Sequence, residues 1–172
     1  FFFAFFGGVP PSSLLMIKGI LIINNHGKPR LLKFYDIIPY ALQQQLTGEI
    51  FRAVVKRSEE VCNFLEGVDS WPGHDSKIIY RHYATLYFIL IVDSSESELG
   101  ILDLIQVFVE TLDRCFENVC ELDLIFHSDK VHYILDEIIM GGMVVETNKE
   151  EILRAIDGLN KVTSSQRGLG SS

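Results

Sequence analysis

The side chains best able to coordinate a metal or activate a nucleophile in this sequence are its five histidines, three cysteines and clustered serines. His127 and His132 lie five residues apart, a spacing that does not put two zinc ligands on one helix face. His132 and Asp136 lie four apart and would share a face, but such a pair is typical of a helix surface. We therefore expect no metal site and no cofactor.

The cysteines and serines do not form a catalytic pattern either. Cys115 and Cys120 lie five residues apart, and neither they nor Cys62 belongs to a Cys-x-x-Cys motif. An odd number of cysteines without a dense framework is typical of a reducing compartment. The serines between positions 94 and 97 precede a predicted helix, where capping explains them, and no Gly-x-Ser-x-Gly elbow or glycine-rich phosphate loop occurs. The sequence indicates a protein that is not an enzyme.

Charge and hydrophobicity narrow the choice of binding partners. The net charge is −8, and no basic run is longer than the one over residues 28–30, whereas nucleic-acid-binding surfaces need clustered Lys and Arg. The longest apolar stretches, residues 1–6 and 86–92, are far shorter than the ~20 residues of a membrane-spanning helix. Hydrophobic residues nevertheless make up 48% of the chain, which favours a permanent interface with another subunit.

The 172 residues divide into one domain with two short ends. Residues 16–161 carry the periodic patterns of a folded domain. We expect residues 1–15, which begin with Phe and are rich in Phe, to be disordered or an artefact of the gene model; a trimmed signal peptide is the alternative. Residues 162–172 are rich in Ser and Gly and are expected to form a flexible tail.

Two hairpins and a short strand make up the predicted sheet. The first hairpin pairs residues 16–24 with residues 31–35 around a turn at Asn25-His26-Gly27, because Asn and Gly tolerate positive φ. The second folds residues 77–92 back on themselves near residues 83–85, and its second half shows no polar alternation, as in a strand buried on both faces. A short strand is predicted over residues 62–65, followed by a loop from Gly67 to Ser76.

Helical periodicity appears in four places. A helix is predicted from Pro39 or Tyr40 to Lys56, and another follows a capping box formed by Ser95 and Glu98. A third is predicted over residues 121–140, with Gly141-Gly142 as its stop. A second capping box at Thr147 to Glu150 begins a last helix, to about residue 159. This order of elements indicates an α/β (α+β) fold in which helices cover an antiparallel sheet.

Several stretches of the chain resemble the small chains, or sigma subunits, of the clathrin adaptors. The clearest is KIIYRHYATLYF over residues 77–88, with NNHGKPRL from residue 24 and VCNFLEG over residues 61–67. The stretch over residues 92–126, which contains SSESELGILDLIQ, is most similar to the sigma subunit of the third adaptor complex. Residues 36–42 and 68–74 depart from the pattern expected for this family.

The resemblance implies a longin-like fold, a five-stranded antiparallel sheet flanked by helices. It also implies a heterotetramer in which the chain packs on a large delta-type subunit, together with a large beta-type and a medium mu-type subunit. Such a complex would act in the cytoplasm, peripherally on Golgi, endosomal and vesicle membranes. Its task would be transport toward lysosomes and related organelles.

The resemblance further implies a site for acidic dileucine signals in the tails of cargo proteins. Its apolar pocket would consist of Ala84, Leu86, Val109, Val119 and Leu124. Asn118 would contact the peptide backbone, and Arg30 would help to hold the acidic residue upstream of the leucines. By this assignment, a Val109→Asp substitution should abolish dileucine binding and leave assembly intact.

Two other interpretations stay open at this point. The apolar residues of the pocket lie in a region rich in core residues, and Arg30 lies beside a turn, so each could be plain core or a solvated charge. The chain could then be a longin-like scaffold subunit of another coat, or of a complex that regulates small GTPases, without a cargo pocket. A pocket closed by bulky side chains would favour this scaffold.

Overall fold

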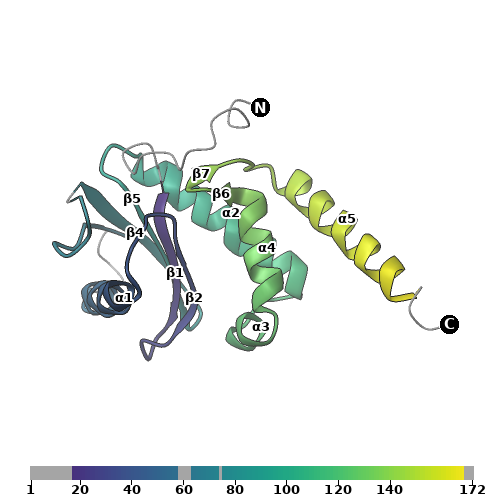
Figure 1. The fold of residues 1–172 in the computed structure, drawn as a ribbon, viewed down its shortest axis with the longest axis horizontal. Coiled ribbons are helices and arrows are strands. Elements are labelled where there is room, and N and C mark those ends of the chain that lie inside the picture. Colours follow the sequence, from purple (N-terminus) through teal and green to yellow (C-terminus); the bar gives the residue numbers. More distant parts are fainter. Residues whose placement is uncertain (1–16, 58–62, 74, 169–172) are drawn as a thin grey trace.

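Two antiparallel hairpins joined side by side form the centre of the molecule (Figure 1). The computed structural model describes residues 17–57, 63–73 and 75–168. The first hairpin pairs β1 (Ile17–Asn24) with β2 (Pro29–Phe34), and the second pairs β4 (Ser76–Tyr83) with β5 (Leu86–Asp93). Both predicted hairpins are therefore confirmed, and the turn of the second falls on Ala84 and Thr85.

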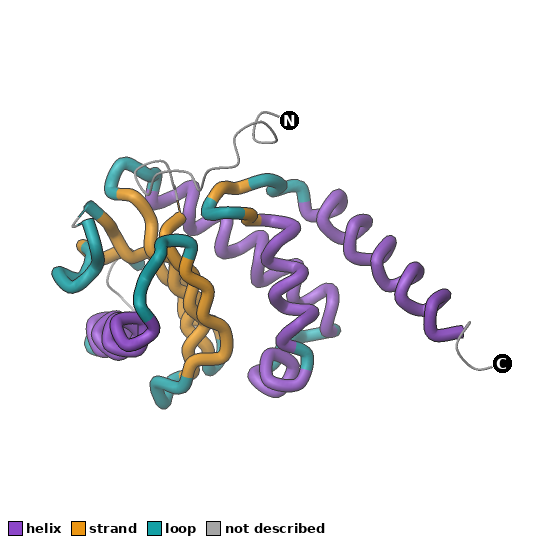
Figure 2. Tube along the Cα trace, viewed as in Figure 1, coloured by secondary structure: helices purple, strands orange, loops and turns teal. Residues whose placement is uncertain are grey.

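The five-stranded sheet has the order β2-β1-β5-β4-β3, in which β3 is the short strand Phe64–Glu66. Every neighbouring pair is antiparallel, with β1 and β5 in the middle. The predicted five-stranded antiparallel sheet flanked by helices is confirmed (Figure 2). Residues 1–16 and 169–172, and Cys62 at the predicted start of the short strand, lie outside the described residues.

The described residues form five helices, which pack on the sheet or on one another (Figure 1). They are α1 (Tyr40–Val55), α2 (Glu98–Phe116), α3 (Glu121–Phe126), α4 (Ser128–Ile138) and α5 (Lys149–Gly168). Helix α1 lies against one face of the sheet, here called the α1 face. Helices α2 and α4 lie on the other, the α2 face, and α5 packs against α2 and α4. A two-stranded ribbon, β6 (Ile139–Met140) and β7 (Met143–Val144), connects α4 to α5.

The central strands bury both of their sides, as the unbroken apolar run in residues 86–92 predicts. In β5, Phe88 and Leu90 pack on the α2 face, whereas Ile89 and Ile91 pack on the α1 face. All eight residues of β1 are buried as well. Because side chains alternate along a strand, these two strands supply the apolar residues of both cores.

The predicted starts of two helices are wrong by one or two residues. Ser97, and not Ser95, caps α2: its Oγ accepts a hydrogen bond from the amide of Gly100 at 3.2 Å. Ser95 is held instead by Asp93, whose Oδ1 accepts from the amide and the hydroxyl of Ser95. At α5, Asn148 replaces the predicted Thr147 as the cap, because Oδ1 of Asn148 accepts hydrogen bonds from the amides of Glu150 and Glu151.

The predicted ends of two helices also need correction. The helix predicted over residues 121–140 is divided at His127, whose φ of −126° and ψ of 37° are not helical. Gly141 and Gly142, with φ of 59° and 81°, form the turn of the β6–β7 ribbon and do not simply stop a helix. The last helix reaches Gly168, beyond the predicted end near residue 159.

Candidate functional site

The turns of the two hairpins meet at one end of the sheet. The amide of Asn25 donates a hydrogen bond to the carbonyl of Thr85 at 3.0 Å, and Asn24 pairs with Leu86 across β1 and β5. The Asn24 side chain is buried, and its Oδ1 accepts hydrogen bonds from the amides of His26 and Lys28. This asparagine fixes the first turn and lets its remaining amide group point toward α3.

Glu121, the first residue of α3, ties that helix to the first hairpin. Its Oε1 accepts hydrogen bonds from Nδ2 of Asn24 at 2.8 Å and from Nε of Arg30 at 2.7 Å. Nη2 of Arg30 also lies 2.7 Å from the same oxygen, and the two side chains are 21% and 27% exposed. The hydrogen bonds from Asn24 and then Arg30 lower the pKa of Glu121, so its carboxylate stays charged.

Asp113 makes the corresponding connection between α2 and the second hairpin. Its Oδ2 accepts from the hydroxyl of Tyr83 at 2.9 Å, and its Oδ1 accepts from the amide of Val119 at 3.0 Å. The bond to Asp113 raises the pKa of Tyr83. Tyr83 directly precedes the turn residue Ala84, so one carboxylate holds that turn beside the junction between α2 and α3.

These contacts bring the seven residues predicted for cargo binding to the same end of the α2 face. Four of them, Leu86, Val109, Val119 and Leu124, belong to one apolar cluster and are between 1% and 7% exposed. The other three lie around this cluster and comprise two exposed residues, Ala84 and Asn118, and the half-buried Arg30. The four apolar side chains are thus packed closely in this structure.

Two of the predicted residues have unusual backbone conformations. Ala84 and Asn118 adopt positive φ, 52° and 76°, and Glu117 beside Asn118 has φ of 52°. Positive φ is uncommon for residues other than Gly, with Asn the most tolerant of them. The Asn118 amide donates to the carbonyl of Asp113 at 3.1 Å, which closes the end of α2. The tight turns expose both side chains at the edge of the apolar cluster.

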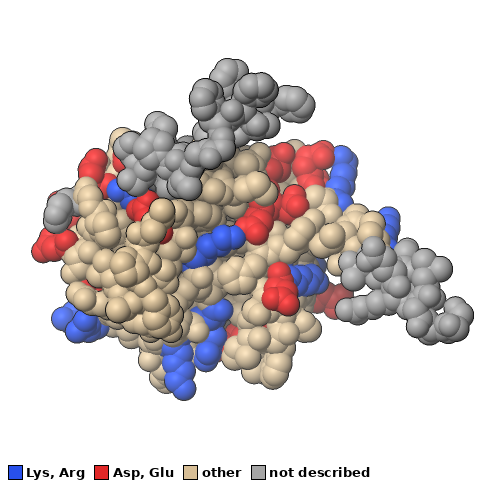
Figure 3. Space-filling model, viewed as in Figure 1, with Lys and Arg blue, Asp and Glu red and all other residues tan. Residues whose placement is uncertain are grey.

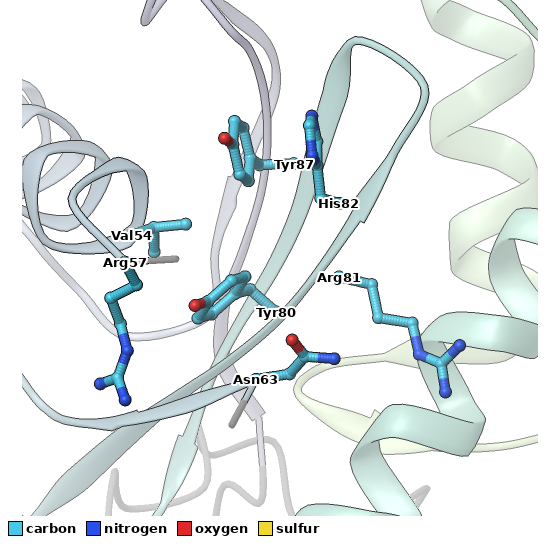
Figure 4. Close-up of a pocket in the computed structure, with 7 residues that line it drawn as sticks. All are labelled: Val54, Arg57, Asn63, Tyr80, Arg81, His82 and Tyr87. Atoms are coloured by element: carbon cyan, nitrogen blue, oxygen red, sulfur yellow. The ribbon is translucent and has the colours of Figure 1, made fainter. Parts of the chain in front are cut away.

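A second candidate lies on the α1 face, where a cavity of about 290 Å³ separates α1 from β4 and β5 (Figure 4). Arg57, Tyr80 and Tyr87 point into this region, whereas the guanidinium of Arg81 turns away from them toward the other face of the sheet. Arg81 instead donates from Nη1 to Oε1 of Gln106 on α2 at 3.1 Å. None of the seven predicted cargo-binding residues lines this cavity.

Charged side chains are unevenly distributed on the face shown in Figure 3. Lysines and arginines gather toward the end where the β1–β2 hairpin turns, and acidic side chains lie mostly toward the opposite end. Among the residues that the structure describes, no three His, Cys, Asp or Glu side chains come together as a metal site would require. None of the described helices is both long and apolar enough to cross a membrane.

Sequence reasoning missed Glu121, Asn24 and Asp113, which hold the site together. Glu121 is 97 residues from Asn24 and 91 from Arg30. No local pattern connects residues so far apart, because their contact exists only once α3 packs against β2. Opposite charges at Arg30 and Glu121 were the available signal, and a sequence with 15 basic and 23 acidic residues offers many such pairs.

The fold agrees with what comparisons of the sequence and structure find. The family model for the clathrin adaptor complex small chain matches residues 16–163. The chain therefore belongs to the clathrin adaptor small chain family.

Within this family the chain is similar to sigma subunits of AP-3. It is 64% identical to "AP-3 complex subunit sigma-2" of Homo sapiens over 157 residues, 91% of this chain and 81% of that protein. It is 62% identical to "AP-3 complex subunit sigma" of Dictyostelium discoideum, covering 90% of this chain and 91% of that protein. A chain in a homology model of the full-length AP-3 complex in a stretched open conformation matches with TM-score 0.67 and 42% identity, covering 89% of this chain and 98% of that one.

Proposed function

We propose that this chain is the small sigma subunit of a heterotetrameric adaptor complex of the AP-3 type. In this assembly it packs on a large delta-type subunit, beside a beta-type and a mu-type subunit. The complex lies peripherally on Golgi, endosomal and vesicle membranes and carries cargo toward lysosome-related organelles. The observation that supports this most is the identity of 64% to an AP-3 sigma subunit over 91% of the chain.

Exposed apolar side chains support a role inside an assembly. Leu122 and Phe126 of α3 are 59% and 74% exposed, and Leu99 of α2 is 75% exposed. Apolar patches on a small subunit are typical of permanent interfaces, where a partner removes them from water. The fraction of hydrophobic residues, 48%, fits the same interpretation.

The site at the two hairpin turns is our candidate for binding acidic dileucine signals. Leu86, Val109, Val119 and Leu124 form the buried apolar cluster that would line the leucine pocket, Ala84 and Asn118 border it, and Arg30 lies beside it. Burying two leucines of a cargo tail contributes roughly 3–6 kcal/mol, and ordering the flexible tail offsets a good part of that. The result is a weak contact that avidity on a membrane strengthens.

The burial of the four apolar residues also fits the alternative function, a longin-like scaffold subunit of another coat or of a GTPase-regulating complex. In that case these side chains are only core. In the cargo-binding case they must part to admit leucine side chains, as a site assembled with a large subunit could allow. Peptide binding distinguishes the two functions.

The first experiment is co-expression of the tagged full chain with the amino-terminal trunk of a delta-type large subunit, followed by size-exclusion chromatography. Stoichiometric co-elution is expected, and the complex is then titrated with a fluorescent acidic dileucine peptide. A control peptide carries Ala in place of both leucines. A folded monomer that ignores the trunk would overturn the proposed assembly, and co-elution without peptide binding would favour the scaffold.

A further inference from the structure

Arg30 and Glu121 form an ion pair inside the candidate cargo site. Two guanidinium nitrogens of Arg30 lie 2.7 Å from a single oxygen, Oε1 of Glu121. The pair is more than two-thirds buried, and Asn24 donates to the same oxygen at 2.8 Å. A carboxylate of this chain therefore already contacts the Nε and Nη2 side of the Arg30 guanidinium.

On this basis, and resting on the proposed function, we propose that Glu121 determines the charge specificity of the site by neutralising Arg30. An arginine with a carboxylate in contact carries little net charge toward a third group, so it attracts a second carboxylate weakly. This chain then binds mainly the leucines of a signal, and its preference for an acidic residue upstream of them is suppressed. That preference appears only when Glu121 is displaced or when another basic group joins the site.

The position of Glu121 makes such control local. The Glu121 side chain accepts a hydrogen bond from Asn24. Asn24 is in turn fixed in the first hairpin, because its Oδ1 accepts hydrogen bonds from two backbone amides. It begins α3, whose Leu124 belongs to the apolar cluster. A movement of α3 that opens the apolar cluster would therefore also separate Glu121 from Arg30, so both halves of the site would become available together.

Glu121→Gln is the informative variant, because the amide keeps the shape of the side chain and an oxygen that accepts from Asn24 and Arg30. Four forms are compared: the natural chain, Glu121→Gln, Arg30→Gln and Glu150→Gln. Glu150 is an exposed residue of α5, so its substitution is a control with the same change in net charge. Each form is titrated as the full chain and in complex with the delta-type trunk.

Two peptides are used, one with the acidic residue upstream of two leucines and one with Gln in its place. The measurement is the dissociation constant of the Gln peptide divided by that of the acidic peptide, which gives the preference for the acidic peptide. A purely structural role of Glu121 would not change this ratio. We expect Glu121→Gln to increase the preference for the acidic peptide roughly tenfold, equivalent to about 1.4 kcal/mol, and Glu150→Gln to leave it unchanged. The Arg30→Gln variant should bind both peptides with the same dissociation constant.

An unchanged or smaller ratio in Glu121→Gln, with dileucine binding retained, would overturn this inference alone. If Glu121→Gln weakens the binding of both peptides to the same degree, Glu121 only supports the structure, and this result would overturn the inference as well. Absence of leucine-dependent binding in every form would overturn the proposed cargo site and this inference together.

Discussion

The two faces of the sheet bury similar apolar side chains but are closed in different ways. On the α1 face, α1 and the loop that carries Trp71 cover the strands, and Trp71 itself is 1% exposed. On the α2 face, the apolar cluster ends where the hairpin turns meet α3. That end is held by polar contacts, Arg30 with Glu121 and Tyr83 with Asp113.

This difference indicates where the molecule can bind something reversibly. Separating apolar side chains in a core creates cavities and costs several kcal/mol. An ion pair or hydrogen bond that is partly exposed to solvent contributes much less, because water or another polar group can replace the lost partner. The polar end of the α2 face can therefore exchange partners, whereas the α1 face should act as a fixed support.

The largest effect is expected from Trp71→Ala on the α1 face. The ring stacks on Phe34 at a centroid distance of 6.0 Å, and its Nε1 donates to Asp36 at 3.3 Å. A Cβ on Gly19 would lie 3.2 Å from the ring, so the strand leaves space for this side chain. Truncation should lower the free energy of unfolding by about 3–5 kcal/mol, measured by urea denaturation.

The same variant sharpens the comparison when peptide binding is measured under conditions where it remains folded. If the α1 face is only a support, the affinity for the dileucine peptide should stay within twofold of the natural chain. A larger loss in the folded variant would show that the two faces are coupled, contrary to our interpretation.

Val109→Asp tests the polar end of the α2 face. We expect a loss of dileucine binding of at least tenfold, because a carboxylate would be desolvated against the leucine side chains. Assembly with the delta-type trunk should remain. Ile101→Asp is the matched control: Ile101 lies on the same helix and is also 4% exposed, but it is two turns away from Val109.

In the complexes that form, the Ile101 variant should keep its affinity for the peptide and the Val109 variant should not. Chromatography and fluorescence titration give the two measurements. If Val109→Asp fails to assemble at all, Val109 is only a core residue and its assignment to the site is wrong.

The sheet was predictable because its signals are local. Alternating or unbroken apolar runs and the Asn-His-Gly turn define the strands of both hairpins, and they do not depend on the rest of the chain. The resemblance to sigma subunits then implied that five strands form one antiparallel sheet flanked by helices. The contact between Arg30 and Glu121 could not be predicted in this way, since it depends on how α3 packs.

The helix boundaries were less predictable because several residues compete for the same capping role. Ser95 with Glu98 forms a capping box in the sequence, but Asp93 takes both the amide and the hydroxyl of Ser95. The chain therefore stays in a turn for two more residues, and Ser97 caps α2. Spacing identified the helix correctly and misplaced its first turn, because short-range hydrogen bonds decide between neighbouring serines.

A pair of alanine variants checks this boundary, with a smaller expected effect. Ser97→Ala should lower the free energy of unfolding by about 1 kcal/mol, because the amide of Gly100 loses its acceptor. Ser95→Ala should cost less, since the backbone amide of Ser95 keeps its bond to Asp93. Thermal denaturation compares the two, and a larger effect at Ser95 would contradict the observed cap.

The smallest effect concerns Asp36, a polar residue at the edge of the apolar cluster on the α1 face. Burial raises the pKa of this carboxyl above its ordinary value of 3.8, and the bonds from Trp71 and the charge of Lys18 offset this only in part. Its Oδ1 is buried and has no hydrogen-bond partner among the residues that the structure describes. The carboxylate is therefore disfavoured in the folded state.

The sign of the pH dependence follows from that shift. Below the ordinary pKa, Asp36 is protonated in both the folded and the unfolded chain and contributes nothing. As the pH rises through the raised pKa, the unfolded chain releases its proton first, so the folded state loses stability and stays less stable at neutral pH. Asp36→Asn keeps an oxygen that accepts from Trp71 and carries no charge.

The variant should therefore be slightly more stable than the natural chain at pH 7, and this difference should shrink as the pH falls toward about 3. Urea denaturation at several pH values measures it. Glu150→Gln, on the exposed surface of α5, controls for the change in net charge. If Asp36→Asn is still more stable than the natural chain at acidic pH, then the shape of the Asp36 side chain and not its charge is unfavourable. Packing alone would then limit stability at this position of the α1 face.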